Sequence, residues 1–270
     1  MATQAEKAER FLALHQGPAP LLMPNPWDVG SARLLEGMGF EALATTSGGF
    51  AATLGRLDGA VERDEAVAHA AVVVAAVELP VSADFENCFA HEPAGVAETV
   101  ELGIGAGLAG CSVEDWDGEA IYDAGLAVER VAAAVEAAHR GPVHLVLTAR
   151  AENHLRGRDD LADTIDRLQR YQEAGADVLF APGVTDPDDL RTLLAEVDRP
   201  VNVVGRPGCP PVSELAALGV RRVSVGGWFA LAALGAAVEA ATEFRDNGTF
   251  GYLEGAKTGA SAVRSTFGPA

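Results

Sequence analysis

Acidic residues end two neighbouring apolar runs of the sequence. Asp84 and Glu86 close the run that follows Pro80, and Glu114 closes the next run. Residues two positions apart on an extended strand point to the same side, so the carboxylates of Asp84 and Glu86 can converge. Converging carboxylates repel one another unless a cation lies among them, and hard oxygen ligands suit Mg²⁺. The pattern predicts a metal site formed by Asp84, Glu86 and Glu114, and solvated loop acids are the alternative interpretation.

Two further segments could bind an anionic substrate. Ser47-Gly48-Gly49 offers a hydroxyl and backbone N–H groups near the start of a helical segment, which suits a carboxylate. An ordinary glycine-rich turn is the alternative. Arg150 ends an apolar run that starts at residue 143, where a charge needs a partner. It can pair with Glu114 or Glu152, or it can hold a substrate carboxylate through two parallel hydrogen bonds.

The histidines favour other roles. His69 and His139 lie in helical patterns and His144 lies in a strand pattern, where packing or surface positions are the usual interpretation. His91 and His154 lie in loops that we expect at the rim of the site, where they could reach a ligand.

These residues must lie on strands to converge, and the positions of Pro and Gly in the sequence predict eight strands. Pro before an aliphatic residue alternates with Gly before an apolar run, and strands are expected to start near residues 21, 41, 80, 108, 142, 177, 200 and 221. Ala-rich segments with helical periodicity separate them. This alternation predicts an α/β fold, a (β/α)8 barrel of the TIM type, in preference to a doubly wound open sheet. The active site then lies at the carboxyl ends of the strands.

The predicted domain organisation is a single barrel with a short tail. We expect the catalytic barrel to occupy residues 1–246. The remaining residues, 247–270, contain five glycines and are expected to form a short helical tail. This tail would pack outside the barrel or on a neighbouring subunit.

Composition narrows the function classes. The 270 residues include 20 basic and 39 acidic side chains, a formal net charge of −19 at pH 7. Such a surface repels nucleic-acid phosphates and anionic lipids, which argues against nucleic-acid and membrane partners. The longest apolar stretch, Ala66 to Val77, is too short to span a bilayer. The three cysteines form no Cys-x-x-Cys pair, which favours a reducing, cytoplasmic setting.

From about residue 20 to about residue 230, the sequence resembles the isocitrate lyase and phosphoenolpyruvate mutase superfamily. The segment VSADFE resembles the Asp-Ala-Asp signature of the family, with Phe85 and Glu86 in the last two places. The other matching motifs are NPWDVGSAR at Asn25–Arg33, TSGG at Thr46–Gly49 followed by Leu54-Gly55 and Asp58, VED at Val113–Asp115, and TARAE at Thr148–Glu152.

The resemblance implies how a metal would be held. Asp84 would be the main ligand of Mg²⁺, with Mn²⁺ as an alternative ion. Asp58, Glu86 and Glu114 would hold the water molecules of the metal. Asp58 and Glu114, together with Arg150, are therefore our candidate catalytic residues.

The resemblance also implies how a substrate would be held. Thr46, Ser47 and Gly48 would bind the carboxylate of a small 2-oxo acid, and Arg150 would bind near its oxo oxygen. Asn202, on the seventh strand, is expected to contribute to the same binding site. A cation at the oxo oxygen stabilises the negative charge that appears when the adjacent bond breaks. Arg206, His91 and His154 are candidates to bind a second carboxylate.

Three family features are missing. Isocitrate and methylisocitrate lyases carry a Lys-x-Cys-Gly-His loop after the Glu-Asp motif, whereas residues 116–125 read WDGEAIYDAG. The lid of the mutases has no clear match, and their His after the sixth strand is replaced around Ala181-Pro182. A shorter lid predicts a more open site that protects a reactive intermediate poorly. We therefore expect a lyase that cleaves a C–C bond of an acid such as oxaloacetate or an isocitrate-like dicarboxylate.

Two alternatives stay open. The first is C–P chemistry, as in a phosphonopyruvate hydrolase or a phosphoenolpyruvate mutase. The second is a 2-oxo acid binding protein that has lost turnover. The resemblance also implies a homo-oligomer, a dimer or a tetramer, because the family typically exchanges C-terminal helices between subunits.

Overall fold

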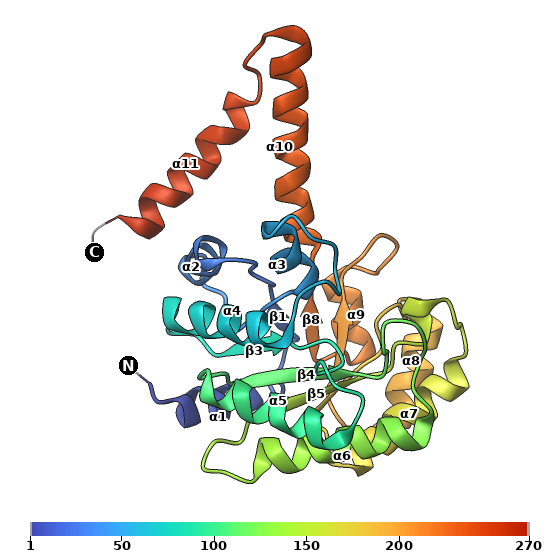
Figure 1. Ribbon diagram of the computed structural model, residues 1–270. Coiled ribbons are helices and arrows are strands. Elements are labelled where there is room, and N and C mark those ends of the chain that lie inside the picture. The colour runs from blue at the N-terminus through green and yellow to red at the C-terminus, as the bar shows by residue number, and fades with distance from the viewer. Residues whose placement is uncertain (1, 269–270) are drawn as a thin grey trace.

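Eight short parallel strands form the centre of the computed structural model, which describes residues 2–268. The strands pair in the order β1-β8-β7-β6-β5-β4-β3-β2, and a hydrogen bond of 3.1 Å from Ala44 N to Pro24 O links β2 back to the end of β1. The expected (β/α)8 barrel is therefore confirmed (Figure 1). The strand bounds are β1 Leu21–Met23, β2 Leu43–Ala44, β3 Val81–Asp84, β4 Gly110–Glu114, β5 Val146–Arg150, β6 Val178–Phe180, β7 Val201–Val204 and β8 Arg222–Ser224.

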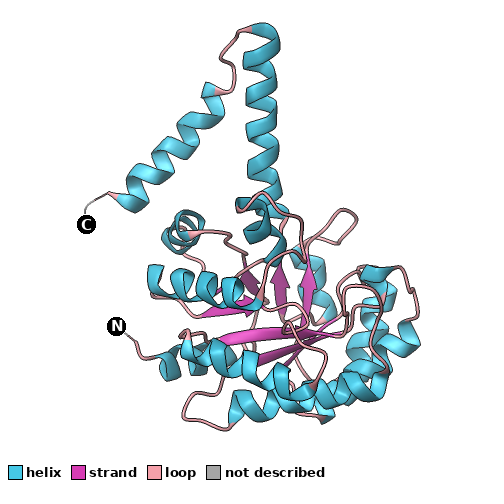
Figure 2. Cartoon of the chain, viewed as in Figure 1, coloured by secondary structure: helices cyan, strands magenta, loops and turns pink. Residues whose placement is uncertain are grey.

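Helices surround the strands (Figure 2). Side chains at their starts accept backbone N–H groups: Asp28 caps α2, and Asp186 caps α8 with Pro187 in the first turn. The helix bounds are α1 Gln4–Leu14, α2 Val29–Gly37, α3 Ser47–Thr53, α4 Arg63–Ala76, α5 Pro93–Gly105, α6 Ala124–His139, α7 Leu161–Glu173, α8 Pro187–Glu196, α9 Val212–Leu218, α10 Trp228–Asn247 and α11 Leu253–Phe267, with a 3₁₀ turn at His154–Arg156.

Helix α1 closes the amino-terminal end of the barrel. Ala8 and Phe11 are fully buried there, in one cluster with Val146 and Val178. A Cβ atom at Gly110 would lie 2.7 Å from the Phe11 ring, so the glycine that starts β4 makes room for the helix. The apolar plug at this end leaves the opposite, carboxyl end of the strands for polar side chains.

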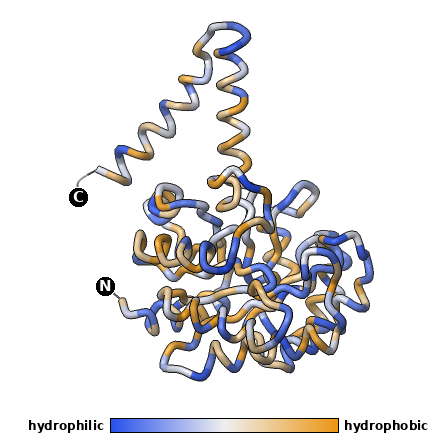
Figure 3. Tube along the Cα trace, in the orientation of Figure 1, coloured by the Kyte–Doolittle hydropathy of each residue, from blue (hydrophilic) through white to orange (hydrophobic). Residues whose placement is uncertain are grey.

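The last two helices leave the barrel (Figure 1). Helix α10 projects away from it, and α11 turns back so that its end lies against α2, where Thr266 packs at Gly37 and the Arg33 guanidinium lies 5.7 Å from the Phe267 ring centroid. The projecting segment begins with α10 at Trp228 and not at residue 247. Residues 228–247 form one continuous helix, which ends at Gly248 in the left-handed conformation. Apolar residues recur along both helices (Figure 3). Within residues 2–268, no helix is long and apolar enough to cross a membrane.

Candidate functional site

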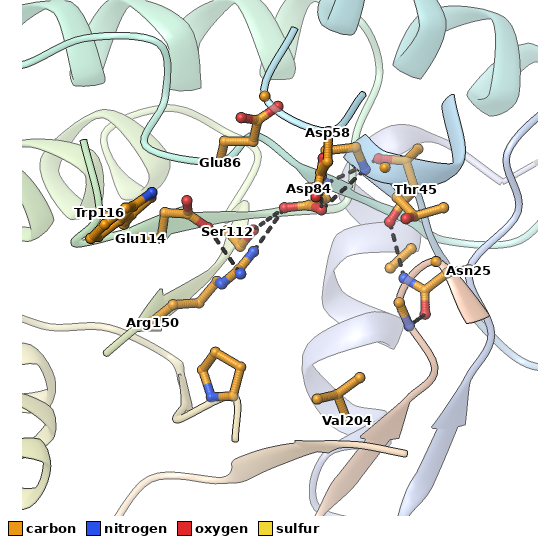
Figure 4. A pocket seen from close by; sticks show the side chains of 18 of the residues that line it. Asn25, Thr45, Asp58, Asp84, Glu86, Ser112, Glu114, Trp116, Arg150 and Val204 are labelled. Carbon is orange, nitrogen blue, oxygen red and sulfur yellow. Dashed lines mark hydrogen bonds and ion pairs between the residues drawn. The ribbon is translucent and has the colours of Figure 1, made fainter. Parts of the chain in front are cut away.

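A large cavity opens at the carboxyl ends of the strands, where the barrel topology predicts an active site. Its volume is about 1110 Å³. Polar side chains from the ends of β2, β3, β4 and β5 gather on one wall (Figure 4). The lining includes all nine site residues expected from the sequence: Thr46, Ser47, Gly48, Asp58, Asp84, Glu86, Glu114, Arg150 and Asn202.

Asp84 lies at the centre of this wall. Its Oδ2 accepts hydrogen bonds from Ser47 N at 3.1 Å and from Ser47 Oγ at 2.9 Å, and its Oδ1 lies 2.9 Å from Arg150 Nη1. The N–H and hydroxyl groups of Ser47 at the start of α3 therefore bind a carboxylate of the chain itself, Asp84, and binding of a substrate carboxylate there stays a prediction. Thr46 is buried as the cap of the same helix, and its Oγ1 accepts from Gly49 N at 3.3 Å.

Glu86 has a strained backbone, and one of its carboxylate oxygens has no hydrogen-bond partner in the part of the chain that the structure describes. It adopts φ = 50°, and the other non-glycine residues with positive φ among those described, Cys88 and Phe89, follow it in the same loop. Such conformations cost about 1–3 kcal/mol each and concentrate at functional sites. The Glu86 Oε1 atom is buried without a hydrogen-bond partner. Burial, together with the neighbouring Asp84 and Asp58 carboxylates, raises the pKa of Glu86 to about 7.

Arg150 is the main cation of the site. Its guanidinium lies 2.9 Å from a carboxylate oxygen of each of Asp84, Glu114 and Glu152. These acids raise the pKa of Arg150 against the opposing effect of its burial, whereas burial raises the pKa of both Glu114 and Glu152. Both structural partners considered from the sequence are therefore present, and Asp84 is a third.

The acids on this wall fit a divalent cation. Asp58 packs against Gly48, where a Cβ atom would lie 3.2 Å from its carboxyl carbon, and it is close enough to Glu86 to raise the pKa of Glu86, as Asp84 does. Hard oxygen atoms, mutual repulsion and a buried carboxylate oxygen without a partner are what Mg²⁺ would satisfy. Asp84, Glu86 and Asp58 are the residues that would hold it. The Glu114 carboxylate faces Arg150 and Arg156 instead.

Asn202 lines the cavity, but its amide group is already paired with neighbouring side chains. Its amide oxygen accepts from Arg222 Nε at 2.9 Å, and its amide nitrogen donates to Ser224 Oγ at 3.0 Å. Arg222 also donates to Thr148 Oγ1 at 3.1 Å, and it has no carboxylate partner among the described residues. Burial lowers the pKa of Arg222 to about 9. A buried cation therefore lies at the floor of the cavity, below the acids.

Of the three residues proposed to bind a second carboxylate, two line the cavity and one does not. Arg206 and His91 line the cavity, and His91 Nδ1 lies 2.9 Å from Tyr122 Oη. His154 is not among the lining residues, because its Nδ1 faces Thr164 Oγ1 at 3.3 Å. Sequence reasoning missed Arg56 and Arg156, which do line the cavity. Arg56 follows helix α3 and Arg156 ends the 3₁₀ turn after β5, so each is a basic residue between a strand and the main helix that follows it.

The loop after β4 is short. Trp116 pairs with Ile121 in an antiparallel bridge, and the Trp116 ring covers the Arg156 guanidinium with 4.5 Å from ring centroid to Cζ. Asp115, next to Glu114, turns into the wall and pairs with Arg167 Nη1 at 3.1 Å and Tyr171 Oη at 2.7 Å. In the Glu-Asp motif Glu114 therefore faces the cavity, whereas Asp115 stabilises the barrel through its contacts with α7.

Comparison with known proteins places the chain in a family. The family model for phosphoenolpyruvate phosphomutase matches residues 11–245. The uncharacterised protein Rv1998c of Mycobacterium tuberculosis is 35% identical over 237 residues, which are 87% of this chain and 89% of that protein. Oxaloacetate decarboxylase 2 of Pseudomonas fluorescens is 32% identical over 247 residues, 86% of this chain and 82% of that protein.

A solved structure agrees over nearly the whole chain. A crystal structure from Burkholderia cenocepacia, described provisionally as a lyase or mutase, is 52% identical and superposes with a TM-score of 0.95. The match covers 98% of this chain and 97% of that one, so it includes the two projecting helices. Superfamily members act on small carboxylates and typically use Mg²⁺. By its matched motifs, barrel and family model, this chain belongs to the phosphoenolpyruvate mutase/isocitrate lyase superfamily.

Proposed function

We propose that the protein is a Mg²⁺-dependent lyase that cleaves a C–C bond of a small 2-oxo or 2-hydroxy dicarboxylate, with oxaloacetate as the leading substrate. The observation that carries this proposal is the convergence of Asp58, Asp84 and Glu86 beside Arg150 in one cavity. When bound there, Mg²⁺ would polarise the oxo oxygen of the substrate. The similarity to an oxaloacetate decarboxylase over most of the chain supports the choice of substrate.

The residues of the chain have separate tasks in this proposal. Thr46, Ser47 and Gly48, at the amino end of α3, bind the carboxylate next to the oxo group. Arg150 donates hydrogen bonds to the oxygen that gains negative charge, and Glu114 and Glu152 hold its guanidinium in position. Loss of one such donor typically costs about 3–4 kcal/mol of barrier.

The second carboxylate lies in the outer part of the cavity in this proposal. The cations there are Arg56, Arg156 and Arg206. In oxaloacetate this carboxylate leaves as CO₂ when its C–C bond breaks, and the electron pair remains as an enolate. A proton from water, which the short loop after β4 admits, then gives pyruvate. A site open to water suits this outcome better than transfer of a phosphoryl group, which water would intercept.

The test is turnover of oxaloacetate, read as pyruvate by NMR, with Mg²⁺ at a fixed concentration. Because Mg²⁺ alone decarboxylates oxaloacetate slowly, the matched control is the Asp84→Ala protein in the same buffer, and Asp188→Asn serves as an exposed control. We expect turnover that depends on Asp84, with Mn²⁺ binding by electron paramagnetic resonance weakened by about 100-fold or more in Asp84→Ala. Full activity and unchanged metal affinity in Asp84→Ala would refute the metal site.

A panel of further substrates, tested under the same conditions, distinguishes the lyase from C–P chemistry and from a non-catalytic binding protein. It includes isocitrate, 2-methylisocitrate and phosphonopyruvate. Phosphate released from phosphonopyruvate, with no pyruvate from oxaloacetate, would favour C–P chemistry. Tight binding of a 2-oxo acid without any product by mass spectrometry would favour a non-catalytic binding protein.

A further inference from the structure

Two histidines and an aspartate meet at the end of the barrel opposite the cavity. His139 is the last residue of α6, His144 lies two residues before β5, and Asp177 directly precedes β6. All three therefore lie at the amino-terminal ends of the strands, whereas the acids of the proposed active site lie at the carboxyl ends. The amino-terminal face of such a barrel contributes to stability rather than to the reaction.

The geometry brings three ligand atoms together. His139 Nε2 lies 3.0 Å from Asp177 Oδ2, and His144 Nε2 lies 3.0 Å from Asp177 Oδ1. The two imidazole rings stack with 3.9 Å between centroids and 15° between planes, so both Nε2 atoms face the same carboxylate. One ligand atom from each residue lies within 4.8 Å of the others. The histidines are five positions apart, within the spacing that zinc-binding histidine pairs use.

Asp177 is held in place by the neighbouring strand. Leu147 N donates to its Oδ2 at 2.8 Å, and Asp177 N donates to Leu147 O at 3.0 Å, so both its side chain and its backbone are fixed to β5. The carboxylate is thus preorganised beside the two imidazole rings.

We propose that His139, His144 and Asp177 form a second metal site, for a transition-metal cation of the Zn²⁺ class. Imidazole nitrogen atoms select Zn²⁺, Ni²⁺ or Cu²⁺ over Mg²⁺, which prefers oxygen ligands. Three protein ligands leave a fourth position, and a water molecule fills it. The side chains of His139 and His144 are 25% and 45% exposed, so an ion reaches the site from solvent. The bound ion ties the end of α6 to the starts of β5 and β6.

The experiment measures Zn²⁺ binding to untagged, metal-stripped protein by competition with a chromophoric chelator, in excess Mg²⁺ so that the carboxylate site is filled. We expect one equivalent of Zn²⁺, bound at least about 10–100-fold more weakly in His139→Gln and in His144→Gln. His154→Gln, which changes an imidazole outside the cluster, keeps the wild-type affinity. Undiminished Zn²⁺ binding in His144→Gln would overturn the proposal.

A second readout uses the wild-type protein, so it does not depend on the folding of a variant. Cu²⁺ added at one equivalent should give an electron paramagnetic resonance spectrum with coupling to two nitrogen nuclei, and the melting temperature should rise on addition of Zn²⁺. A spectrum without nitrogen coupling and an unchanged melting temperature would assign the cluster to hydrogen bonding alone. Neither readout uses enzyme activity, so failure of this proposal and failure of the lyase proposal are distinguishable.

Discussion

The Arg150 guanidinium reaches from β5 across β4 to the Asp84 carboxylate on β3, at 2.9 Å between Nη1 and Oδ1. The same carboxylate accepts the Ser47 N–H and hydroxyl groups through its other oxygen. One acid therefore joins the guanidinium, the start of α3 and the group of carboxylates that would hold a metal. A ligand that takes Asp84 as a partner must compete with these contacts, so binding of substrate and of metal should be coupled.

Replacement of Arg150 should cost stability as well as activity. In Arg150→Met the buried carboxylates of Glu114 and Glu152 lose the nearer of the two cations that they share and keep only Arg156, and breaking a buried ion pair typically costs about 3–5 kcal/mol. Urea unfolding measures the loss, and Arg150→Lys should restore only part of it because Lys lacks the planar fork. The double variant Arg150→Met/Glu152→Gln should recover some stability. A fully stable Arg150→Met protein would show that the pairs contribute nothing to the fold.

Replacement of Gly48 should lower activity by displacing Asp58 and should not disrupt helix α3. A Cβ atom there would lie 3.2 Å from the Asp58 carboxyl carbon and would push that acid aside, so Gly48→Ala should lower activity by roughly tenfold or more. Gly30→Ala is the matched control, because Gly30 is likewise the second residue of its helix and meets only an ordinary contact of 3.5 Å. Equal kcat/KM for the two variants would remove Asp58 from the site.

His15 should make the fold less stable as the pH drops below about 6.5, whereas the raised pKa values of the buried Glu86, Glu114 and Glu152 act in the opposite direction. Burial, followed by the nearby Arg222, lowers the pKa of His15 from 6.5 to about 3, so the unfolded chain binds a proton that the folded chain rejects. His15 Nδ1 donates to Phe11 O at 2.8 Å, which leaves Nε2 as the unprotonated nitrogen beside Arg222. Between pH 6.5 and about 3 the unfolded state therefore holds more protons at this site, and the contribution of His15 to stability decreases on acidification by up to about 1.4 kcal/mol per pH unit.

A variant isolates this contribution. His15→Gln keeps a polar side chain of similar reach and does not titrate, so its free energy of unfolding should depend less steeply on pH in the same window. Urea unfolding at pH 7, 6 and 5 provides the measurement. Identical slopes for wild type and His15→Gln would mean that His15 is accessible to protons in the folded state.

Local sequence signals were enough to predict the strands and the acids at their ends. The partners of individual side chains depend on long-range contacts and could not be predicted. Pro and Gly mark chain reversals, so the strand starts were confirmed to within a few residues, with β5 starting at Val146 because a turn occupies the preceding positions. The partner of the Ser47 hydroxyl was not predictable, because Asp84 reaches it from a different strand. Arg221 and Arg222 are adjacent in an apolar run, and the sequence does not say which one points inward.

The exposed apolar side chains of α10 should bury against a second copy of this chain. Leu231, Leu234 and Val238 share one face of the helix and are 53%, 48% and 65% exposed in the single chain. We expect a dimer or a tetramer by light scattering, and Leu234→Glu should shift it toward the monomer. Ala236→Glu adds the same charge on the other side of α10 and should leave the assembly intact. A wild-type monomer at micromolar concentration, or equal dissociation of both variants, would exclude this face as the interface.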